Sequence, residues 1–263
     1  QTFAPTGTFS VAATSDSGLA ASFSSTSTEV CTVDSSTGTV TMLKVGDCKL
    51  TASQAGNDNY HAATAVERTV AIGQAAQTLT FEQPVAQTFA PTGTFSVAAT
   101  SDSGLAVRVS STTPEVCTVA ESTVTMLKTG ACALKAEQAG DSNYNEAAPV
   151  AHTVSIDKAD QTITFAEPAA QAFQPNGTFS VSASSSANLD VAFASDTASV
   201  CTVSGNTVTM HSIGTCRLTA SQAGDGNYNA ADISRDVIIN NSLGVPSISA
   251  TSPVTIAATG TVS

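Results

Sequence analysis

Apolar and polar residues alternate along most of the chain in short runs, which is the pattern of half-buried β-strands. The runs form three matching sets, separated internally by turns rich in Gly, Ser, Asn and Asp, and no stretch keeps the helical period of about 3.6 residues. The inward-facing residues of the first two runs are Phe9, Val11, Ala13 and Leu19, Ala21, Phe23; then Phe95, Val97, Ala99 and Leu105, Val107, Val109; then Phe179, Val181, Ala183 and Leu189, Val191, Phe193. We therefore expect each set to form a small all-β domain.

The three sets are copies of one another. Residues 1–20, QTFAPTGTFSVAATSDSGLA, recur letter for letter at 87–106, and Cys31 recurs after 86 residues, with a third occurrence 84 residues later. This spacing is too long for a solenoid repeat of about 20–45 residues and fits one small domain copied in tandem. The predicted domains are residues 1–75 (first copy), 76–159 (second copy) and 160–240 (third copy), followed by an extension at 241–263.

A complete copy has the strand pattern of an immunoglobulin-like sandwich. With a TLTF-type run at its start and an HTVSI-type run at its end, it holds about seven short strands. The first copy has no counterpart of QTLTFEQPVA (77–86). We expect it to lack one strand and to present an unpaired, partly apolar edge.

Six cysteines fall into three pairs, each with one further strand between its members. If all three strands lay side by side in one sheet, the cysteines would be roughly 10 Å apart, whereas a disulfide needs Cα atoms within about 7 Å. The chain should therefore cross to the facing sheet before the second cysteine, which makes each bridge an inter-sheet disulfide. With only three histidines, zinc sites are disfavoured, and disulfides indicate an oxidising compartment. The predicted pairs are Cys31 with Cys48, Cys117 with Cys132, and Cys201 with Cys216.

Several strings resemble bacterial Ig-like repeat modules: QTITF (161–165), GTFSVSA (177–183), SVCTVSGNTVTM (199–210) and LTASQAGDGNYNAA (218–231). Such modules occur in tandem in large secreted or surface-anchored bacterial proteins, many of them adhesins. The resemblance implies a non-enzymatic structural protein outside the cell, either a stalk segment of a surface adhesin or a subunit of an extracellular filament. It offers no catalytic residues to transfer.

Charge and chemistry narrow the choice of partners. Charged residues make up 11% of the chain and the formal net charge is −12, so nucleic acid and anionic membranes are poor partners. No apolar run approaches the roughly 18 residues that membrane insertion needs. His61, His152 and His211 do not superpose between copies; His152, for example, aligns with Arg68 and Arg235. We interpret them as surface or edge-strand residues and expect neither an enzyme nor a cofactor.

The loops at 56–59, 140–143 and 224–227 could offer oxygen ligands to Ca²⁺. A calcium site takes about six to eight oxygens, usually including several carboxylates, and each loop has one acidic residue. We favour tight turns, with the following tyrosine packed on the sandwich edge, and calcium binding stays an open alternative.

A different class of function, a carbohydrate-binding module, would need an exposed aromatic platform. The candidates are Tyr60, Tyr144 and Tyr228. The low aromatic content of 5% and the lack of Trp argue against this alternative.

Two interpretations of the ends remain open. In one, the boundaries reflect how the piece was cut, and the tail begins a different module. In the other, the tail is a donor strand, with Val254, Ile256 and Ala258 on one face, that completes the first copy of the next subunit and builds a head-to-tail filament. The partners would then be other copies of this chain, or otherwise other domains of the same surface protein.

Overall fold

The chain is built from β-strands throughout the part that the structure describes. The structure is a computed structural model that describes residues 1–241, so the donor-strand residues Val254, Ile256 and Ala258 lie outside the described residues. The chain divides into two compact units, Gln1–Lys158, which holds the first two copies, and Ala159–Ser263, which holds the third. The domain boundaries drawn from the sequence stay predictions. Within the described residues, no helix is long and apolar enough to cross a membrane.

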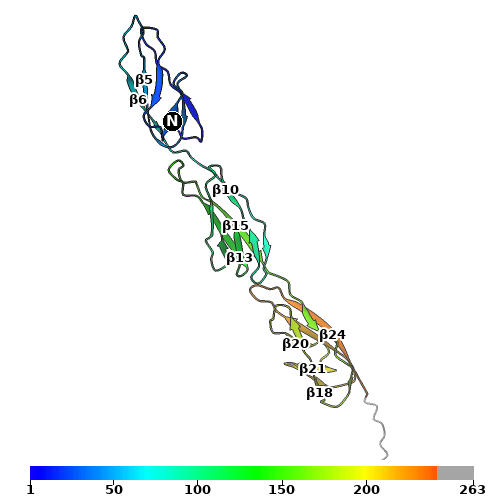
Figure 1. Ribbon diagram of the computed structural model, residues 1–263. Helices are drawn as coiled ribbons and strands as arrows, with labels where there is room; N and C mark the ends of the chain where they lie inside the picture. Colours follow the sequence, from blue (N-terminus) through cyan, green and yellow to red (C-terminus); the bar gives the residue numbers. More distant parts are fainter. Residues whose placement is uncertain (242–263) are drawn as a thin grey trace, which may run out of the picture. The chain divides into compact units, whose positions relative to one another are not determined.

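The first copy folds into two three-stranded sheets (Figure 1). One has the order β1-β4-β3 and the other β2-β5-β6, and every strand pair in them is antiparallel. The strands are β1 (Thr8–Ser10), β2 (Ser22–Ser25), β3 (Cys31–Val33), β4 (Thr39–Met42), β5 (Gly46–Ser53) and β6 (Val66–Ile72).

The second copy has the same two sheets with additions. Its sheets are β12-β13-β9, β11-β14-β15-β8 and the two-stranded β10-β7. The strands are β7 (Leu79–Phe81), β8 (Gln87–Thr88), β9 (Thr94–Ser96), β10 (Ala99–Ser101), β11 (Arg108–Ser111), β12 (Cys117–Ala120), β13 (Thr123–Met126), β14 (Gly130–Glu137) and β15 (Val150–Asp157).

The third copy repeats the arrangement of the second. Its sheets are β18-β22-β21, β17-β24-β23-β20 and β16-β19. The strands are β16 (Ile163–Phe165), β17 (Gln171–Ala172), β18 (Thr178–Ser180), β19 (Ala183–Ser185), β20 (Ala192–Ser195), β21 (Cys201–Ser204), β22 (Thr207–Met210), β23 (Gly214–Gln222) and β24 (Ala231–Asn240).

The strand alternation that predicted an immunoglobulin-like sandwich is confirmed, but one expected strand of each complete copy is divided into two. The run through Phe95, Val97 and Ala99, expected as one strand, divides into β9, which pairs with β13, and β10, which pairs with β7. The backbone passes from the β12-β13-β9 sheet to the β10-β7 sheet near Val97, whose side chain stays buried. The period-2 pattern continues through the break because side chains on both halves still face the core.

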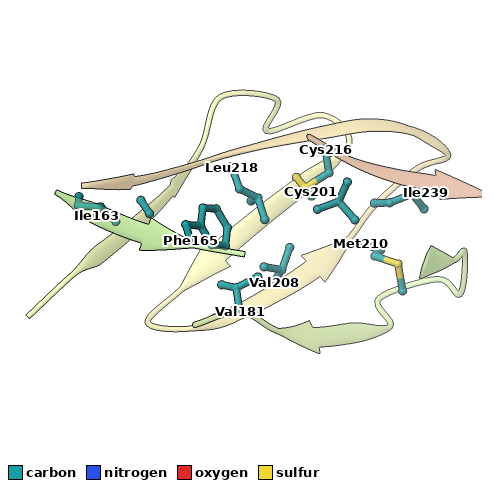
Figure 2. Packing of buried hydrophobic residues seen from close by; sticks show 11 residues of the cluster. Ile163, Phe165, Val181, Cys201, Val208, Met210, Cys216, Leu218 and Ile239 are labelled. Carbon is teal, nitrogen blue, oxygen red and sulfur yellow. A yellow bond between two sulfur atoms is a disulfide. The ribbon is translucent and has the colours of Figure 1, made fainter. Parts of the chain in front are cut away.

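Each core lies between the two sheets and is made of the inward residues of the alternating runs. In the TVTM strand β22, Val208 and Met210 are buried while the threonines face outward. Figure 2 shows the third copy, in which Phe165 of β16 lies among side chains from the facing strands, beside Leu218 and Val208. Strand β16 therefore supplies part of the core, and a copy without such a strand has its interior open on that side.

Candidate functional site

The three predicted cystine bridges are present and link the two sheets of each copy. Their Cα–Cα separations are 5.6, 5.6 and 5.7 Å, and all six cysteines have no exposed surface. In each copy the first cysteine lies in one sheet (β3, β12 or β21) and the second in the facing sheet (β5, β14 or β23), which confirms the predicted crossing. Each bridge closes a short loop, which in the chain-entropy account stabilises the folded state by about 3 kcal/mol.

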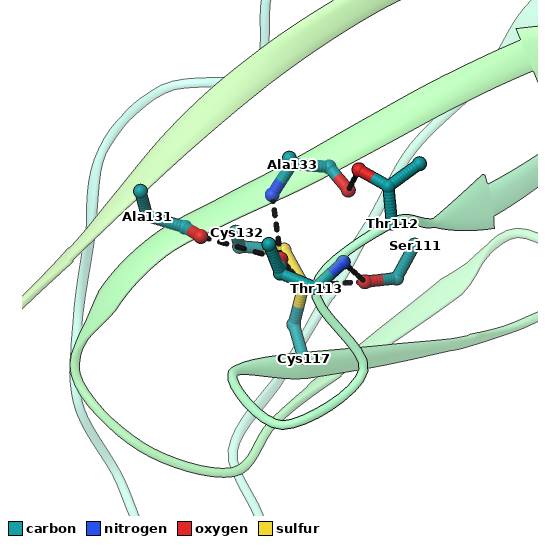
Figure 3. The surroundings of a disulfide bond; sticks show 7 residues. All are labelled: Ser111, Thr112, Thr113, Cys117, Ala131, Cys132 and Ala133. Carbon is teal, nitrogen blue, oxygen red and sulfur yellow. Dashed lines mark hydrogen bonds between the residues drawn. A yellow bond between two sulfur atoms is a disulfide. The ribbon is translucent and has the colours of Figure 1, made fainter.

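A small Ser/Thr network surrounds each disulfide. In the second copy, Thr113 Oγ1 donates to the carbonyl of Ala131 at 3.2 Å and accepts from the amide of Ala133 at 2.9 Å (Figure 3). The amide of Thr113 in turn donates to Ser111 Oγ at 3.1 Å. These bonds tie the loop between β11 and β12 to β14 on both sides of Cys132, so the loop that leads to Cys117 is held against the strand that carries its disulfide partner.

The first copy has an open groove on the side where the complete copies carry β7 or β16. The groove encloses about 810 Å³ and is lined by the segment Val11–Asp16 and by residues of β2, β5 and β6. Phe23, Leu50 and Val70 give it an apolar floor, and Arg68 stands at its side. We call this surface the strand-accepting groove, because the second and third copies show what fills the equivalent place.

In the second copy, a buried glutamine fixes the start of the filling strand. Gln77 Nε2 donates to Gln138 Oε1 and to the carbonyl of Asn145, and Gln77 Oε1 accepts from the hydroxyls of Ser101 and Ser103 at 2.7 and 2.6 Å. All of its polar atoms are thus satisfied in a side chain that is 5% exposed. Because a buried amide without partners would be costly, these contacts select glutamine at this position.

The third copy repeats this arrangement. Gln161 Nε2 donates to Gln222 Oε1 at 2.7 Å and to the carbonyl of Asn229 at 2.7 Å, and Gln161 Oε1 accepts from Ser185 Oγ. Two complete copies of the same chain therefore hold the same residue by the same three kinds of contact, and the contact that Ser103 adds in the second copy has no equivalent because Ala187 stands at that position.

The residue after the glutamine is also fixed by a side chain. Asp102 accepts hydrogen bonds from the hydroxyl of Thr78 at 2.7 Å and from its amide at 3.0 Å. The Thr78 hydroxyl, followed by the Thr78 amide, holds the pKa of Asp102 below its ordinary value. In the third copy, Ser186 Oγ accepts from the amide of Thr162 at 3.0 Å.

A third anchor holds the aromatic end of the strand. His152 Nε2 lies 2.7 Å from the carbonyl oxygen of Phe81, and in the third copy Arg235 Nε donates to the carbonyl of Phe165 at 3.2 Å. Both phenylalanine rings are buried. The sequence interpretation of His152 as a surface or edge-strand residue did not include this role. The shared partner is a backbone carbonyl, which accepts from His and Arg alike, so the alignment of unlike side chains concealed a common function.

In the first copy the same positions are uncovered. Val70 and Ala52 are half-buried, whereas their counterparts in both complete copies are at most 1% exposed. Further pairs show the same contrast between the first and second copies: Val11 against Val97, and Ala63 against Ala147. The first copy also has no counterpart of β10, since the strand that would pair with it is not there.

The polar anchors are nevertheless kept in the first copy. Ser15, Asp16 and Ser17 match Ser101, Asp102 and Ser103, and the two hydroxyls are 2.8 Å apart in both sets. Gln54 aligns with Gln138, and Arg68 aligns with Arg235. The groove therefore keeps the side chains that hold the strand in the other copies.

The glycine–asparagine loops are tight turns closed by a side chain. Asp141 Oδ1 accepts from the amides of Asn143 and Tyr144 at 2.8 and 2.9 Å, and Asn57 Oδ1 does the same in the first copy. A Cβ on Gly140, whose φ is +78°, would lie 2.4 Å from a backbone oxygen, so the turn requires glycine. These bonds favour the turn interpretation, and calcium binding stays an untested alternative.

The expected packing of each tyrosine on its own sandwich edge is wrong for Tyr144. Its ring stands edge-on to that of Phe3 in the first copy, with centroids 5.8 Å apart. The loop is carried to the first copy because Ala75 pairs with it and because Val45 donates its amide to Asn143 Oδ1 at 3.1 Å. Tyr144 is thus partly covered, which removes it from an exposed carbohydrate platform, while Tyr60 is 52% exposed.

No known protein-family model matches the chain, and no curated protein matches its sequence. Similar solved structures include mouse protocadherin-24 EC1-3, at 16% identity and a TM-score of 0.35, and Drosophila N-cadherin EC1-3, at 13% and 0.34; each match covers 89% of this chain and 92% of the other. The surface layer protein SbsC, domains 1-6, is similar at 17% identity and a TM-score of 0.27 over 86% of this chain and 36% of that one. Likeness at this level carries nothing about function.

Proposed function

We propose that this chain is a structural segment of an extracellular protein, a stalk built from disulfide-linked sandwiches in a bacterial surface adhesin. The observation that carries the proposal is the same fully buried inter-sheet disulfide in all three copies. Disulfides of this kind persist in oxidising surroundings. They also keep the two sheets of each small domain together when its ends are pulled apart.

The position of the bridges suits this role. In the second copy, the disulfide joins β12 to β14, and β14 lies directly beside the last strand β15. The final strand of a copy therefore passes tension to a strand that is covalently tied to the opposite sheet. A chain that serves as a spacer needs this mechanical integrity and no catalytic step, and the proposal assigns it none.

A second candidate is a filament subunit assembled by strand donation, and the open groove of the first copy favours it. An extended segment that adds to a sheet is held by main-chain hydrogen bonds and by pockets for alternate side chains. When such a segment comes from another subunit, the contact is head-to-tail and propagates. The partner would then be a second copy of this chain.

Electron microscopy of the native material, together with surface labelling of intact source cells, tests the two candidates. The stalk predicts label on intact cells and single extended particles of the purified chain. The filament predicts polymers that disappear when residues 242–263 are deleted. A protein that is protected from label in intact cells and carries reduced cysteines when extracted would contradict both.

A further inference from the structure

The ligand specificity of the groove in the first copy can be inferred from the second and third copies, because each of them holds a strand in the equivalent place. In the second copy the filling segment is Gln77-Thr-Leu-Thr-Phe81, and in the third it is Gln161-Thr-Ile-Thr-Phe165. Three of its features are recognised by side chains or buried surface: the glutamine amide, the following threonine and the apolar pair that ends in Phe.

We propose that the strand-accepting groove of the first copy binds an extended strand of sequence Gln-Thr-Leu/Ile-Thr-Phe. The donor is a further segment of the same repeat type, and not β7 or β16 of the same chain, because those strands are already held in their own copies. This concerns the same groove as the filament candidate above, but it does not depend on polymer formation and it names a donor other than the tail. Ser15, Ser17 and Gln54 take the glutamine amide, and Asp16 takes the amide and hydroxyl of the threonine. The Leu or Ile and Phe side chains cover Val70 and Ala52, and Arg68 donates to the carbonyl of Phe.

The positions of these groups in the first copy support the assignment. The two serine hydroxyls already lie 2.8 Å apart, as do those that grip Gln77. Arg68 is exposed, whereas Arg235, which is bonded to the Phe165 carbonyl, is half-buried. The exposed parts of Val11, Ala52 and Val70 are the surfaces that the strand covers in the complete copies. The groove is thus preformed, with the anchors in place and the apolar floor uncovered.

The same specificity disfavours the tail as the donor. When Val254-Thr-Ile256 is placed where Leu79-Thr-Phe81 lies, Pro253 falls at the Thr78 position and Ser252 at the Gln77 position. Proline has neither an amide hydrogen nor a hydroxyl for Asp16, and serine is too short to take the place of the glutamine amide. The range 242–263 contains no Gln and no Phe.

Peptide binding to the complete 263-residue chain tests the proposal. The probe is a fluorescent peptide of residues 77–86, QTLTFEQPVA, followed by anisotropy, with the tail peptide of residues 252–261, SPVTIAATGT, as competitor. We expect saturable binding of one peptide per chain, because the other two copies already hold their strands. Gln77→Ala or Phe81→Ala in the peptide should each weaken binding about tenfold or more, and the tail peptide should compete at least about tenfold less well.

Variants of the chain locate the site. Asp16→Asn and the double variant Ser15→Ala/Ser17→Ala should weaken binding, while Asp47→Asn, the same charge change at an exposed position outside the groove, should leave it unchanged. A chain with QTLTFEQPVA fused directly before Gln1 should no longer bind the peptide, and the amides of residues 13–15, which match β10, should exchange more slowly with solvent. These variants leave the core and the disulfide untouched, so circular dichroism should show them folded.

The proposal is overturned if the peptide does not bind at about 1 mM, if a scrambled peptide or the tail peptide binds equally well, or if the fused chain still binds the peptide. Polymer formation is scored separately by microscopy. Peptide binding without polymers supports the groove assignment and removes the filament, whereas polymers without peptide binding overturn the assignment and leave the filament standing.

Discussion

Single polar side chains hold the edges of these sandwiches together. The chain has few charged residues, and most side-chain contacts between its segments are hydrogen bonds made by Ser, Thr, Gln and Asn, whose side chains bond to nearby backbone groups. The ion pairs among the described residues lie between exposed side chains, such as Lys44 with Glu29 and Arg217 with Asp236, and pairs of that kind stabilise little. The anchors Gln77, Asp102 and His152 fix where a strand starts and ends, and the apolar residues between them supply the burial.

The bond from Asp102 to Thr78 predicts a pH dependence of the second copy. The Thr78 hydroxyl and amide lower the pKa of Asp102 in the folded state from its ordinary value of 3.8. The stabilisation is therefore present above pH 3.8 and is lost as the pH falls through the lower folded-state value. We expect Asp102→Asn to speed amide exchange in β7 at neutral pH, with a difference from the wild type that shrinks on acidification below pH 3.8. The third copy, with Ser186 at this position, serves as the internal control, and an unchanging difference would contradict the account.

A backbone conformation in the second copy predicts a stabilising substitution. Glu121 has a φ of +54° in the turn between β12 and β13, where the third copy has Gly205 at +60°. A side chain in this region is strained, so Glu121→Gly should stabilise the second copy by about 0.5–1 kcal/mol. Gly205→Ala should destabilise the third copy by a similar amount, although an added Cβ meets nothing within 4 Å there. Urea unfolding with a probe in each copy measures both changes, and a destabilising Glu121→Gly would be the contrary result.

At the scale of elements, the alternation of apolar residues and the spacing of the cysteines predicted the strand faces and one change of sheet. The faces of the strands followed from the period-2 pattern, and the change of sheet between β4 and β5 followed from the distance that a disulfide can span. The break between β9 and β10 could not be predicted, because inward residues continue across it. The contact of Tyr144 with Phe3 could not be predicted either, because the loop has nearly the same sequence in all three copies and does not indicate which surface the tyrosine ring contacts. The sequence predicted that the first copy lacks one strand, but it did not predict which side chains hold that strand in the other two copies.

The filling strand β7 should act as a detachable part of the second copy. Phe81 is 6% exposed and its ring packs beside His152, with centroids 5.1 Å apart. Phe81→Ala should destabilise the second copy by about 3–5 kcal/mol, and fast amide exchange should appear in β7 and β10 before it appears near Cys117. Val85→Ala, at a side chain that is 76% exposed, should change stability by less than about 0.5 kcal/mol. Uniform loss of protection across the whole copy would show that β7 is not a separate part.

At the scale of the whole molecule, stability is distributed over repeated units that each have a covalent bridge. A small sandwich with an Ala- and Val-rich core and no Trp has little apolar surface to bury. One disulfide per copy supplies a fixed share of stability without a larger core. The three copies also provide internal controls for one another, because a change in one can be compared with two unaltered versions of the same fold in the same chain.

Removal of one bridge should affect one copy. The double variant Cys117→Ala/Cys132→Ala should lower the unfolding free energy of the second copy by about 3 kcal/mol in the chain-entropy account, plus the cost of a small cavity. The other two copies should keep their unfolding midpoints in guanidinium chloride. A loss spread equally over all three copies would contradict independent folding of the units.

The most direct test of the structural role is to pull single molecules by their two ends. We predict three separate unfolding steps, each shortened because the chain between the paired cysteines cannot extend. Removing the Cys117–Cys132 bridge should lengthen one step by the roughly 15 residues that it closes, about 50–55 Å at 3.3–3.6 Å per residue, and should leave the other two steps unchanged. A chain that extends without steps, or whose step lengths do not depend on the cysteines, would contradict the proposal that disulfide-linked copies bear tension in series.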